Sequence, residues 1–382
     1  MRRVSMCWTA AMVAATAAGL TATPASATRN GTEVSCNTSA LTMAIANAAA
    51  GDTLTLARHC TYHLTTAYVG GDGLPPITKR LTIRGCDATI VRDSPTAGPF
   101  RIFDVASGGD LRIDDLTIRH GHATGDGGGI RVQSGGTLSL ESSSVIDNTA
   151  DSLGGGVDVA LGGTATIKNS LLTRNNAGDT GGGLQSDGTV NVYDSRLTYN
   201  YANTFGGAVD HESGTAEFHR TSLRDNTSRL DGGGIDIDGG TVKFVDSGLT
   251  NNITAGTTGG GIWNGGATLT LERTEVSGNT VAGGNGKGGG IYNTGTGTQL
   301  TLHESTVDGN SANGPANSQG GGIYNTNGTV TLERSRVQRN DATTAPGGVW
   351  TNVPFTVQDS EIKNNIPSNC TGSPVVVTSC TG

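Results

Sequence analysis

The sequence has 382 residues, with 25 basic and 33 acidic side chains and a formal net charge of −8. A net acidic chain without a basic run is not expected to bind nucleic acid or an anionic membrane surface. Glycine accounts for 61 residues, about twice its usual share, which is typical either of disorder or of a glycine-punctuated repeat.

Residues 1–27 are predicted to be a secretory signal peptide. Arg2 and Arg3 form a basic start, an apolar alanine-rich stretch follows, and residues 25–27 form a small-x-small cleavage site. The mature chain would begin at Thr28, with 23 basic and 33 acidic side chains, and would be secreted to the extracellular space. No later stretch of about 20 apolar residues is present in the sequence, so we expect no membrane insertion.

Residues 28–51 are predicted to cap the N-terminal end of the fold. Ser39 would be the N-cap of a short helix that stops at Gly51. The apolar face of this helix would consist of Leu41, Ala44, Ile45 and Ala48. A helix at this place suits a solenoid, because the unpaired strand edge at its open end invites aggregation unless it is covered.

Five cysteines follow the expected cleavage site, and export permits them to form disulfides. Two bridges and one thiol allow about fifteen arrangements, which the spacing alone leaves open. We favour the two local pairings, Cys36–Cys60 in the N-terminal cap and Cys370–Cys380 near the C-terminus. Cys86 would then remain as a buried thiol that acts as a small apolar side chain rather than as a nucleophile.

Residues 52–365 are built on a repeat of about 26 residues. One mark of the repeat is a Gly-Gly pair closely followed by an aliphatic residue, at Ile130, Val157, Leu184, Val209, Ile235, Ile262, Ile291, Ile323 and Val349. A second mark, aliphatic-x-x-Asn, recurs in phase with the first, at Asn148, Asn175, Asn200, Asn226, Asn252, Asn279, Asn310, Asn340 and Asn365. Two motifs in register over nine units favour an ordered repeat over disorder.

Between the two marks, apolar residues alternate with polar ones, which is the period of a half-buried strand. We expect three short strands per unit and a core of stacked columns, since one unit alone cannot bury its apolar face. Right-handed winding follows from the chirality of parallel crossovers. The sequence therefore predicts an all-β fold: a right-handed parallel β-helix solenoid with a short N-terminal helical cap.

Each repeated asparagine is expected to lie at a corner of a coil, where its amide can bond the same amide one coil above. Nine equivalent positions favour an internal amide ladder over nine binding sites. Residues 366–382 interrupt the repeat with Pro367 and Pro374, and we expect them to form a C-terminal cap closed by the local disulfide.

On these motifs the chain resembles the pectin-lyase-like right-handed β-helix superfamily. Its Gly-Gly-x-Ile and Val-x-x-Asn pairs are similar to the repeats of bacterial polymorphic membrane proteins. The resemblance covers roughly residues 38–382 and implies the fold. It implies no single activity, because the superfamily includes lyases, glycosidases and non-catalytic adhesins.

Chemistry on a solenoid has to come from outward positions, and the residue after each Gly-Gly aliphatic is expected to point outward. This outward row consists of Arg131, Asp158, Gln185, Asp210, Asp236, Trp263, Tyr292, Tyr324 and Trp350. We predict that its aromatic half binds an extracellular polysaccharide or cell-surface glycan, together with Arg131. Insertions in the longest units precede Tyr292 and Tyr324, and insertions collect on binding faces. The alternative is that the rings only pair across neighbouring strands.

The acidic half of the row is a candidate catalytic site. Asp210 and Asp236 on adjacent coils would place their carboxylates about 5 Å apart, as in a retaining glycosidase, and Asp158 lies two coils before Asp210. His211 is the candidate for proton transfer. Against catalysis, the chain has no Gly-His-Gly and no Arg-Ile-Lys segment, which are typical of the superfamily's polygalacturonases.

We expect no metal and no cofactor. The pair His120 and His122 lies near aspartates, but histidines spaced by two near a corner are more often solvated than ligating. Three functions remain open: a secreted glycan-binding protein, a polysaccharide lyase or glycoside hydrolase, and a non-catalytic structural or adhesive rod. The sequence favours the first and indicates no oligomeric state.

Overall fold

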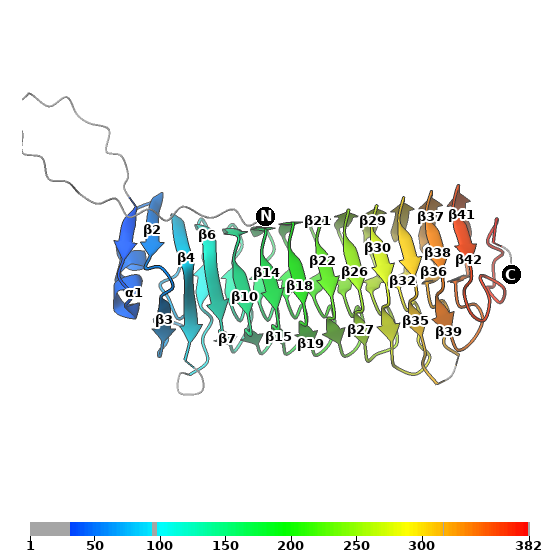
Figure 1. The fold of residues 1–382 in the computed structure, drawn as a ribbon, viewed down its shortest axis with the longest axis horizontal. Helices are drawn as coiled ribbons and strands as arrows, with labels where there is room; N and C mark the ends of the chain where they lie inside the picture. The colour runs from blue at the N-terminus through cyan, green and yellow to red at the C-terminus, as the bar shows by residue number, and fades with distance from the viewer. Residues whose placement is uncertain (1–30, 94–97, 316, 381–382) are drawn as a thin grey trace, which may run out of the picture.

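The computed structural model describes residues 31–93, 98–315 and 317–380, so the predicted signal peptide lies outside the described residues. The chain winds into coils that stack along one axis and form a rod, with α1 at one end and the C-terminal residues at the other (Figure 1). The strands of the described residues form three sheets of 23, 9 and 10 strands, and their pairings are parallel. The predicted right-handed parallel β-helix is confirmed.

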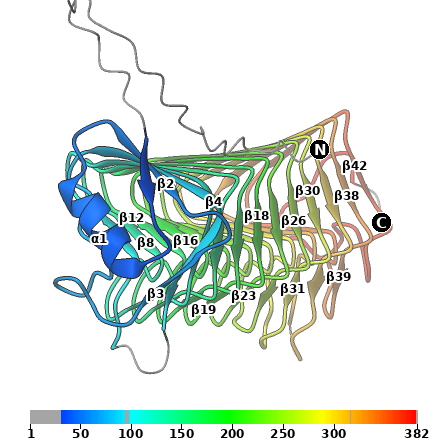
Figure 2. The ribbon, with the colours of Figure 1, turned by 60° about the vertical axis from the view of Figure 1, so that its left-hand side comes forward.

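The N-terminal end of the rod carries α1 (Thr38–Asn47), which lies across the opening of the first coils (Figure 2). Its N-cap is Asn37, whose side chain accepts a hydrogen bond from the Ala40 amide at 3.1 Å, so the choice of Ser39 is wrong by two residues. Asparagine caps a helix as well as serine does. Leu41 and Ile45 are buried, as predicted for the apolar face.

The first coils are irregular and contain the longest strands. They comprise β1 (Thr32–Val34), β2 (Asp52–Leu56), β3 (Thr61–Leu64), β4 (Arg80–Arg92), β5 (Phe103–Val105), β6 (Asp110–Arg119) and β7 (His122–Ala123). Strand β4 pairs with β6 through a shift of register between Arg84 and Ala88. Within the described residues no helix is long and apolar enough to cross a membrane.

Each later coil except the last has four strand segments rather than the three expected, because one sheet bends at a residue with positive φ and its strand is divided in two. The segments before the bend are β9 (Thr137–Glu141), β13 (Thr164–Lys168), β17 (Thr189–Tyr193), β21 (Thr215–His219), β25 (Thr241–Val245), β29 (Thr268–Glu272), β33 (Gln299–His303), β37 (Thr329–Glu333) and β41 (Phe355–Gln358). Those after it are β10 (Ser144–Ile146), β14 (Leu171–Thr173), β18 (Arg196–Thr198), β22 (Ser222–Arg224), β26 (Gly248–Thr250), β30 (Glu275–Ser277), β34 (Thr306–Asp308), β38 (Arg336–Gln338) and β42 (Glu361–Lys363).

Two further sheets close each coil. The narrow one continues from β7 through β11 (Thr149–Ala150), β15 (Asn176–Ala177), β19 (Tyr201–Ala202), β23 (Thr227–Ser228), β27 (Ile253–Thr254), β31 (Thr280–Val281), β35 (Ser311–Ala312) and β39 (Asp341–Ala342). The other continues from β5 through β8 (Ile130–Val132), β12 (Val157–Val159), β16 (Leu184–Ser186), β20 (Val209–His211), β24 (Ile235–Ile237), β28 (Ile262–Asn264), β32 (Ile291–Thr294), β36 (Ile323–Thr326) and β40 (Val349–Thr351). This last sheet carries the predicted outward row, and we call it the row sheet.

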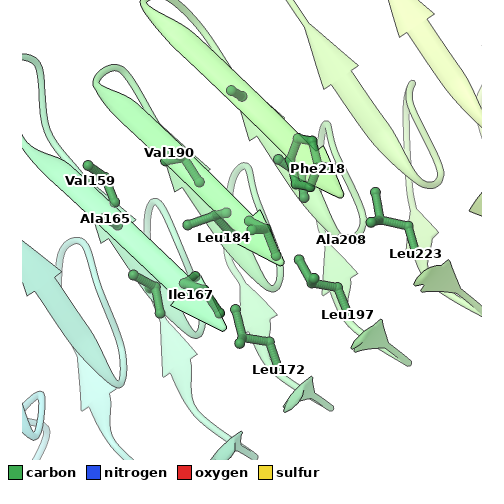
Figure 3. Close-up of a cluster of buried hydrophobic side chains, with 14 of the residues drawn as sticks. Val159, Ala165, Ile167, Leu172, Leu184, Val190, Leu197, Ala208, Phe218 and Leu223 are labelled. Carbon is green, nitrogen blue, oxygen red and sulfur yellow. The ribbon is translucent and has the colours of Figure 1, made fainter. Parts of the chain in front are cut away.

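The core consists of side-chain columns that run along the rod. Figure 3 shows apolar side chains of successive coils one above the next, such as Leu172, Leu197 and Leu223. The expected core of stacked columns is confirmed, because the columns are in register and mostly fully buried. One column consists of Leu138, Ala165, Val190, Ala216, Val242, Leu269, Leu300, Val330 and Phe355. The other consists of Leu140, Ile167, Val192, Phe218, Phe244, Leu271, Leu302, Leu332 and the half-buried Val357. The rings of Phe218 and Phe244 stack with centroids 4.5 Å apart.

The asparagine ladder is confirmed. From Asn148 to Asn365, each buried side-chain amide donates to the carbonyl oxygen of the next asparagine amide, at 2.9–3.1 Å. The backbone N–H of each asparagine donates to the same oxygen, and its amide nitrogen also bonds a carbonyl of the preceding coil. The ladder therefore supplies hydrogen bonds to a corner that is buried from solvent.

The two local disulfides are confirmed as Cys36–Cys60 and Cys370–Cys380. The expectation for Cys86 is wrong, because Cys86 is buried and disulfide-bonded rather than a lone thiol. Cys86 also has a positive φ in the bend of β4, a conformation that the sequence pattern did not indicate.

Candidate functional site

The outward row exists as a continuous line of paired residues on the row sheet. Asp158 pairs with Arg131 and Gln185, Asp210 with Gln185 and Asp236, and Trp263 with Asp236 and Tyr292. Tyr324 then lies between Tyr292 and Trp350. Asp104 of β5, which the repeat search missed, precedes Arg131 in the same row. The register predicted for these residues is therefore correct.

A glycine turn before each strand of the row sheet passes over the row residue of the same coil. Gly206 and Gly232 have φ values of 63° and 59°, which favour glycine. A Cβ atom on Gly232 would lie 2.8 Å from the Cβ atom of Asp236, and one on Gly206 would lie 2.9 Å from the Cα atom of Asp210. The Gly-Gly motif thus brings backbone into contact with the row, and this contact covers its acidic half.

The three predicted catalytic carboxylates are buried, with exposed fractions of 3% for Asp158, 0% for Asp210 and 3% for Asp236. They point away from the core, as expected, but they do not face solvent. A polysaccharide cannot contact them while the glycine turns are in place. The surface of this half is formed instead by Glu212 and Asp238, which are exposed.

Asp158 has a cationic partner. The Arg131 guanidinium lies 3.6 Å from its carboxylate and 3.4 Å from that of Asp126. Burial nevertheless raises the pKa of Asp158 to about 7, with Asp126 adding to the rise and Arg131 opposing it. Arg131 is thus paired with two carboxylates, and it lies at the opposite end of the row from the aromatic residues.

The buried Asp158 should make the stability of the protein depend on pH. Its pKa is about 7 in the folded chain, against about 3.9 in an unfolded chain, so the folded state holds the proton longer and loses stability as pH rises. We expect the unfolding free energy of the parent, relative to Asp158→Asn, to fall by about 2 kcal/mol between pH 5 and pH 7. Chemical denaturation of both proteins at each pH measures this change. If the difference in unfolding free energy between the two proteins were the same at both pH values, the raised pKa of Asp158 would be contradicted.

Asp210 and Asp236 form a tighter group with Asp238. One carboxylate oxygen from each of the three residues lies within 4.8 Å of the other two. Burial raises the pKa of Asp210 to about 8 and holds the pKa of Asp236 well above its usual value. Glu212 and Asp238 raise both pKa values further, and Asp210 adds to the rise at Asp236. The predicted closeness of Asp210 and Asp236 is therefore present, with Asp238 as a member that sequence reasoning missed. Asp238 could have been identified from the sequence, because it lies two residues after Asp236 and alternation places both side chains on the same side.

His211 does not belong to this group. It follows Asp210 in β20, so its ring points to the opposite side, and it is fully buried between Ser186 and Ile237. Burial lowers the pKa of His211, and its ring is therefore neutral at pH 7. This placement does not support the expected role of His211 in proton transfer at the row.

The aromatic half of the row is stacked. The rings of Tyr292 and Tyr324 are 5.5 Å apart, and those of Tyr324 and Trp350 are 4.0 Å apart at 2° between planes. Lys287 from the insertion before β32 lies 5.1 Å above the Tyr324 ring. The alternative of pairing across strands is therefore realised, and the stacked rings present mainly their edges outward.

Trp263 turns aside from this stack and lies over Gly265 of its own coil. A Cβ atom on Gly265 would collide with the indole, at 1.8 Å from one ring carbon. Trp263, Tyr292 and Trp350 remain half-buried, and Tyr324 is buried. Beneath them, inside the coil, lies a second amide ladder, Asn264–Asn293–Asn325, which the repeat motifs did not indicate.

Residues 102–281 match the family described as the right-handed beta helix region. Among solved structures, the chain is similar to the crystal structure of the TibC-catalysed hyper-glycosylated TibA55-350 fragment, at 17% identity and a TM-score of 0.23. That similarity covers 79% of this chain and 99% of the TibA fragment. No curated protein matches the sequence. With its parallel coils, glycine turns and buried asparagine ladder, this chain is a right-handed parallel β-helix of the pectin-lyase-like kind.

Proposed function

We propose that this chain is a secreted glycan-binding β-helix whose binding surface is the aromatic half of the row, Trp263, Tyr292, Tyr324 and Trp350. The observation that carries the proposal is the line of four aromatic side chains held in register on consecutive coils, of which Trp263, Tyr292 and Trp350 are partly exposed. Ring edges and half-exposed indoles supply apolar contacts and polar groups side by side, which suits the mixed surface of a sugar chain.

The affinity of such a surface has to come from repetition. At about 1 kcal/mol per aromatic contact, the three partly exposed residues supply about 3 kcal/mol, which corresponds to binding weaker than about 1 mM. A long polymer that contacts the whole line is therefore the expected ligand, and short oligosaccharides should be retained weakly. Lys287, whose amine lies over the Tyr324 ring, would favour a glycan with acidic groups.

The buried acidic half supports binding rather than turnover. Asp158, Asp210 and Asp236 have exposed fractions of 0–3%, and His211 points into the core. A lyase or hydrolase that used these residues would have to displace the glycine turns that cover them. We therefore place glycan binding first.

The test is retention of the secreted protein on a panel of neutral and acidic insoluble polysaccharides. The double variant Trp263→Ala/Trp350→Ala should lose at least nine-tenths of the retention, since it removes both indoles from about three accessible aromatic contacts. The matched control is Tyr199→Ala/Tyr201→Ala, which removes two tyrosines that are 60% and 38% exposed on another face. Unchanged retention of the tryptophan variant, or equal loss in the control, would contradict the proposal.

A further inference from the structure

Asp210 and Asp236 differ from the other buried acids near the row in having no cationic partner. Asp72 pairs with Arg101 at 2.6 Å, and Asp158 lies 3.6 Å from Arg131. In the described part of the chain, no Lys, Arg or His nitrogen lies within 4.0 Å of a carboxylate oxygen of Asp210 or Asp236. Like charges directly opposite on adjacent strands destabilise a sheet, and burial makes an unpaired charge costlier.

The carboxylate of Asp210 is also without hydrogen bonds. Both of its oxygens are inaccessible to solvent and have no hydrogen-bond partner among the described residues. The Thr180 hydroxyl of the preceding coil approaches it and lowers its pKa, yet that hydroxyl is itself without a bond of good geometry. Buried polar groups in native proteins are almost always paired, so these oxygens indicate a missing partner.

The surroundings define what kind of partner fits. The neighbouring charged groups that act on Asp210 and Asp236 are the acids Asp187, Glu212, Asp231 and Asp238, and the approaching hydroxyl adds another oxygen. An oxygen-only set of donors is suited to a hard divalent cation and not to a soft metal. Oxygens within 4.8 Å of one another can share one ion, because Ca²⁺–O distances of about 2.3–2.6 Å place opposite ligands about 5 Å apart.

We propose that Asp210, Asp236 and Asp238 bind a divalent cation, with Ca²⁺ preferred. The two buried aspartates hold the ion between adjacent coils, and the exposed Asp238 leads to solvent. Ca²⁺ accepts irregular sets of carboxylates, hydroxyls and waters, whereas Mg²⁺ requires a near-octahedral arrangement. The site is separate from the aromatic surface and does not depend on glycan binding.

The first experiment measures ion binding by the full secreted chain after chelator treatment. Calorimetric titration with CaCl₂ should show one ion bound per chain, and the melting temperature should rise with Ca²⁺ concentration because the ion binds the folded state. MgCl₂ is expected to bind at least tenfold more weakly. No binding heat and no shift of the melting temperature with up to 10 mM of either salt (roughly the weakest extracellular Ca²⁺ range) would overturn the proposal and leave protonation as the way these acids are neutralised.

Variants then locate the site. Asp238→Asn changes an exposed residue, so the fold should be intact and Ca²⁺ affinity should drop about tenfold. Asp236→Asn should abolish binding and, without Ca²⁺, should melt at a higher temperature than the parent, since it removes an unpaired buried charge. Asp158→Asn is the matched control, a buried acid of the same row that has its own arginine, and its Ca²⁺ affinity should be unchanged. Parent-like binding by both Asp236→Asn and Asp238→Asn would also overturn the proposal.

Discussion

Replacing Asn226 by alanine is expected to lower the free energy of unfolding by about 3–5 kcal/mol. The Asn226 amide accepts from the backbone N–H and the side-chain amide of Asn200, and it donates to the Leu197 carbonyl and to Asn252. The variant leaves the Asn200 N–H and the Leu197 carbonyl buried without partners, and each such group costs about 1–3 kcal/mol. Chemical denaturation followed by circular dichroism measures the loss.

The control for Asn226 is Asn176→Ala, on the narrow sheet, directly after the ladder residue Asn175 two coils before Asn226. Asn176 is exposed, and its side chain makes no hydrogen bond within the described residues. We expect a change within about 0.5 kcal/mol. A small effect at Asn226, close to that at Asn176, would mean that water reaches the corner and that the ladder adds little to stability.

Replacing Phe244 by alanine should lower the free energy of unfolding by about 3–5 kcal/mol, because a cavity remains in a stacked core that cannot collapse locally. The ring is fully buried and loses its stacking partner Phe218, with which it shares a 4.5 Å centroid distance. Denaturant titration of the purified variant tests this value.

Lys243→Ala is the matched control for Phe244→Ala, since Lys243 precedes Phe244 in β25 and points to the other side. Its side chain is 39% exposed and forms an ion pair with Glu272 at 3.0 Å. Exposed pairs contribute about 0–1 kcal/mol, so the loss should stay within that range. Equal losses of unfolding free energy at both positions would contradict the placement of Phe244 in the core and Lys243 on the outer face of β25.

The columns could be predicted because they depend on register alone. In a solenoid each residue is paired with the residue one repeat away, so a motif that recurs in sequence becomes a line in space. The asparagine ladder and the row from Arg131 to Trp350 both follow from this rule. Structure outside the repeat was predicted less well. The N-cap of α1 is Asn37 rather than Ser39, and Cys86 lies in a bend of β4 that no repeated motif marks in the sequence.

The solvent exposure and ring stacking of the outward row could not be predicted. The alternation of polar and apolar residues gives the direction of a side chain, but not which atoms cover it. The glycine turns that cover Asp210 and Asp236 come from the same coils, yet their path depends on positive φ values at Gly206 and Gly232. Likewise the stacking of Tyr324 on Trp350 depends on ring rotation, which neither the repeat nor the composition encodes.

The sequence by itself determined the parallel β-helix, the membership of each column and the amide ladder, because all of these depend on which residues are neighbours along or across the repeat. The tertiary structure alone decided that the acidic half of the row is buried and that Asp210 has no hydrogen-bond partner among the described residues. It also decided that His211 lies in the core and that Tyr292, Tyr324 and Trp350 are stacked. The physical reason is that the burial of a side chain and the orientation of a ring depend on which backbone a turn brings over the strand. The repeat period states which residues are neighbours, but it does not state the path of the turn.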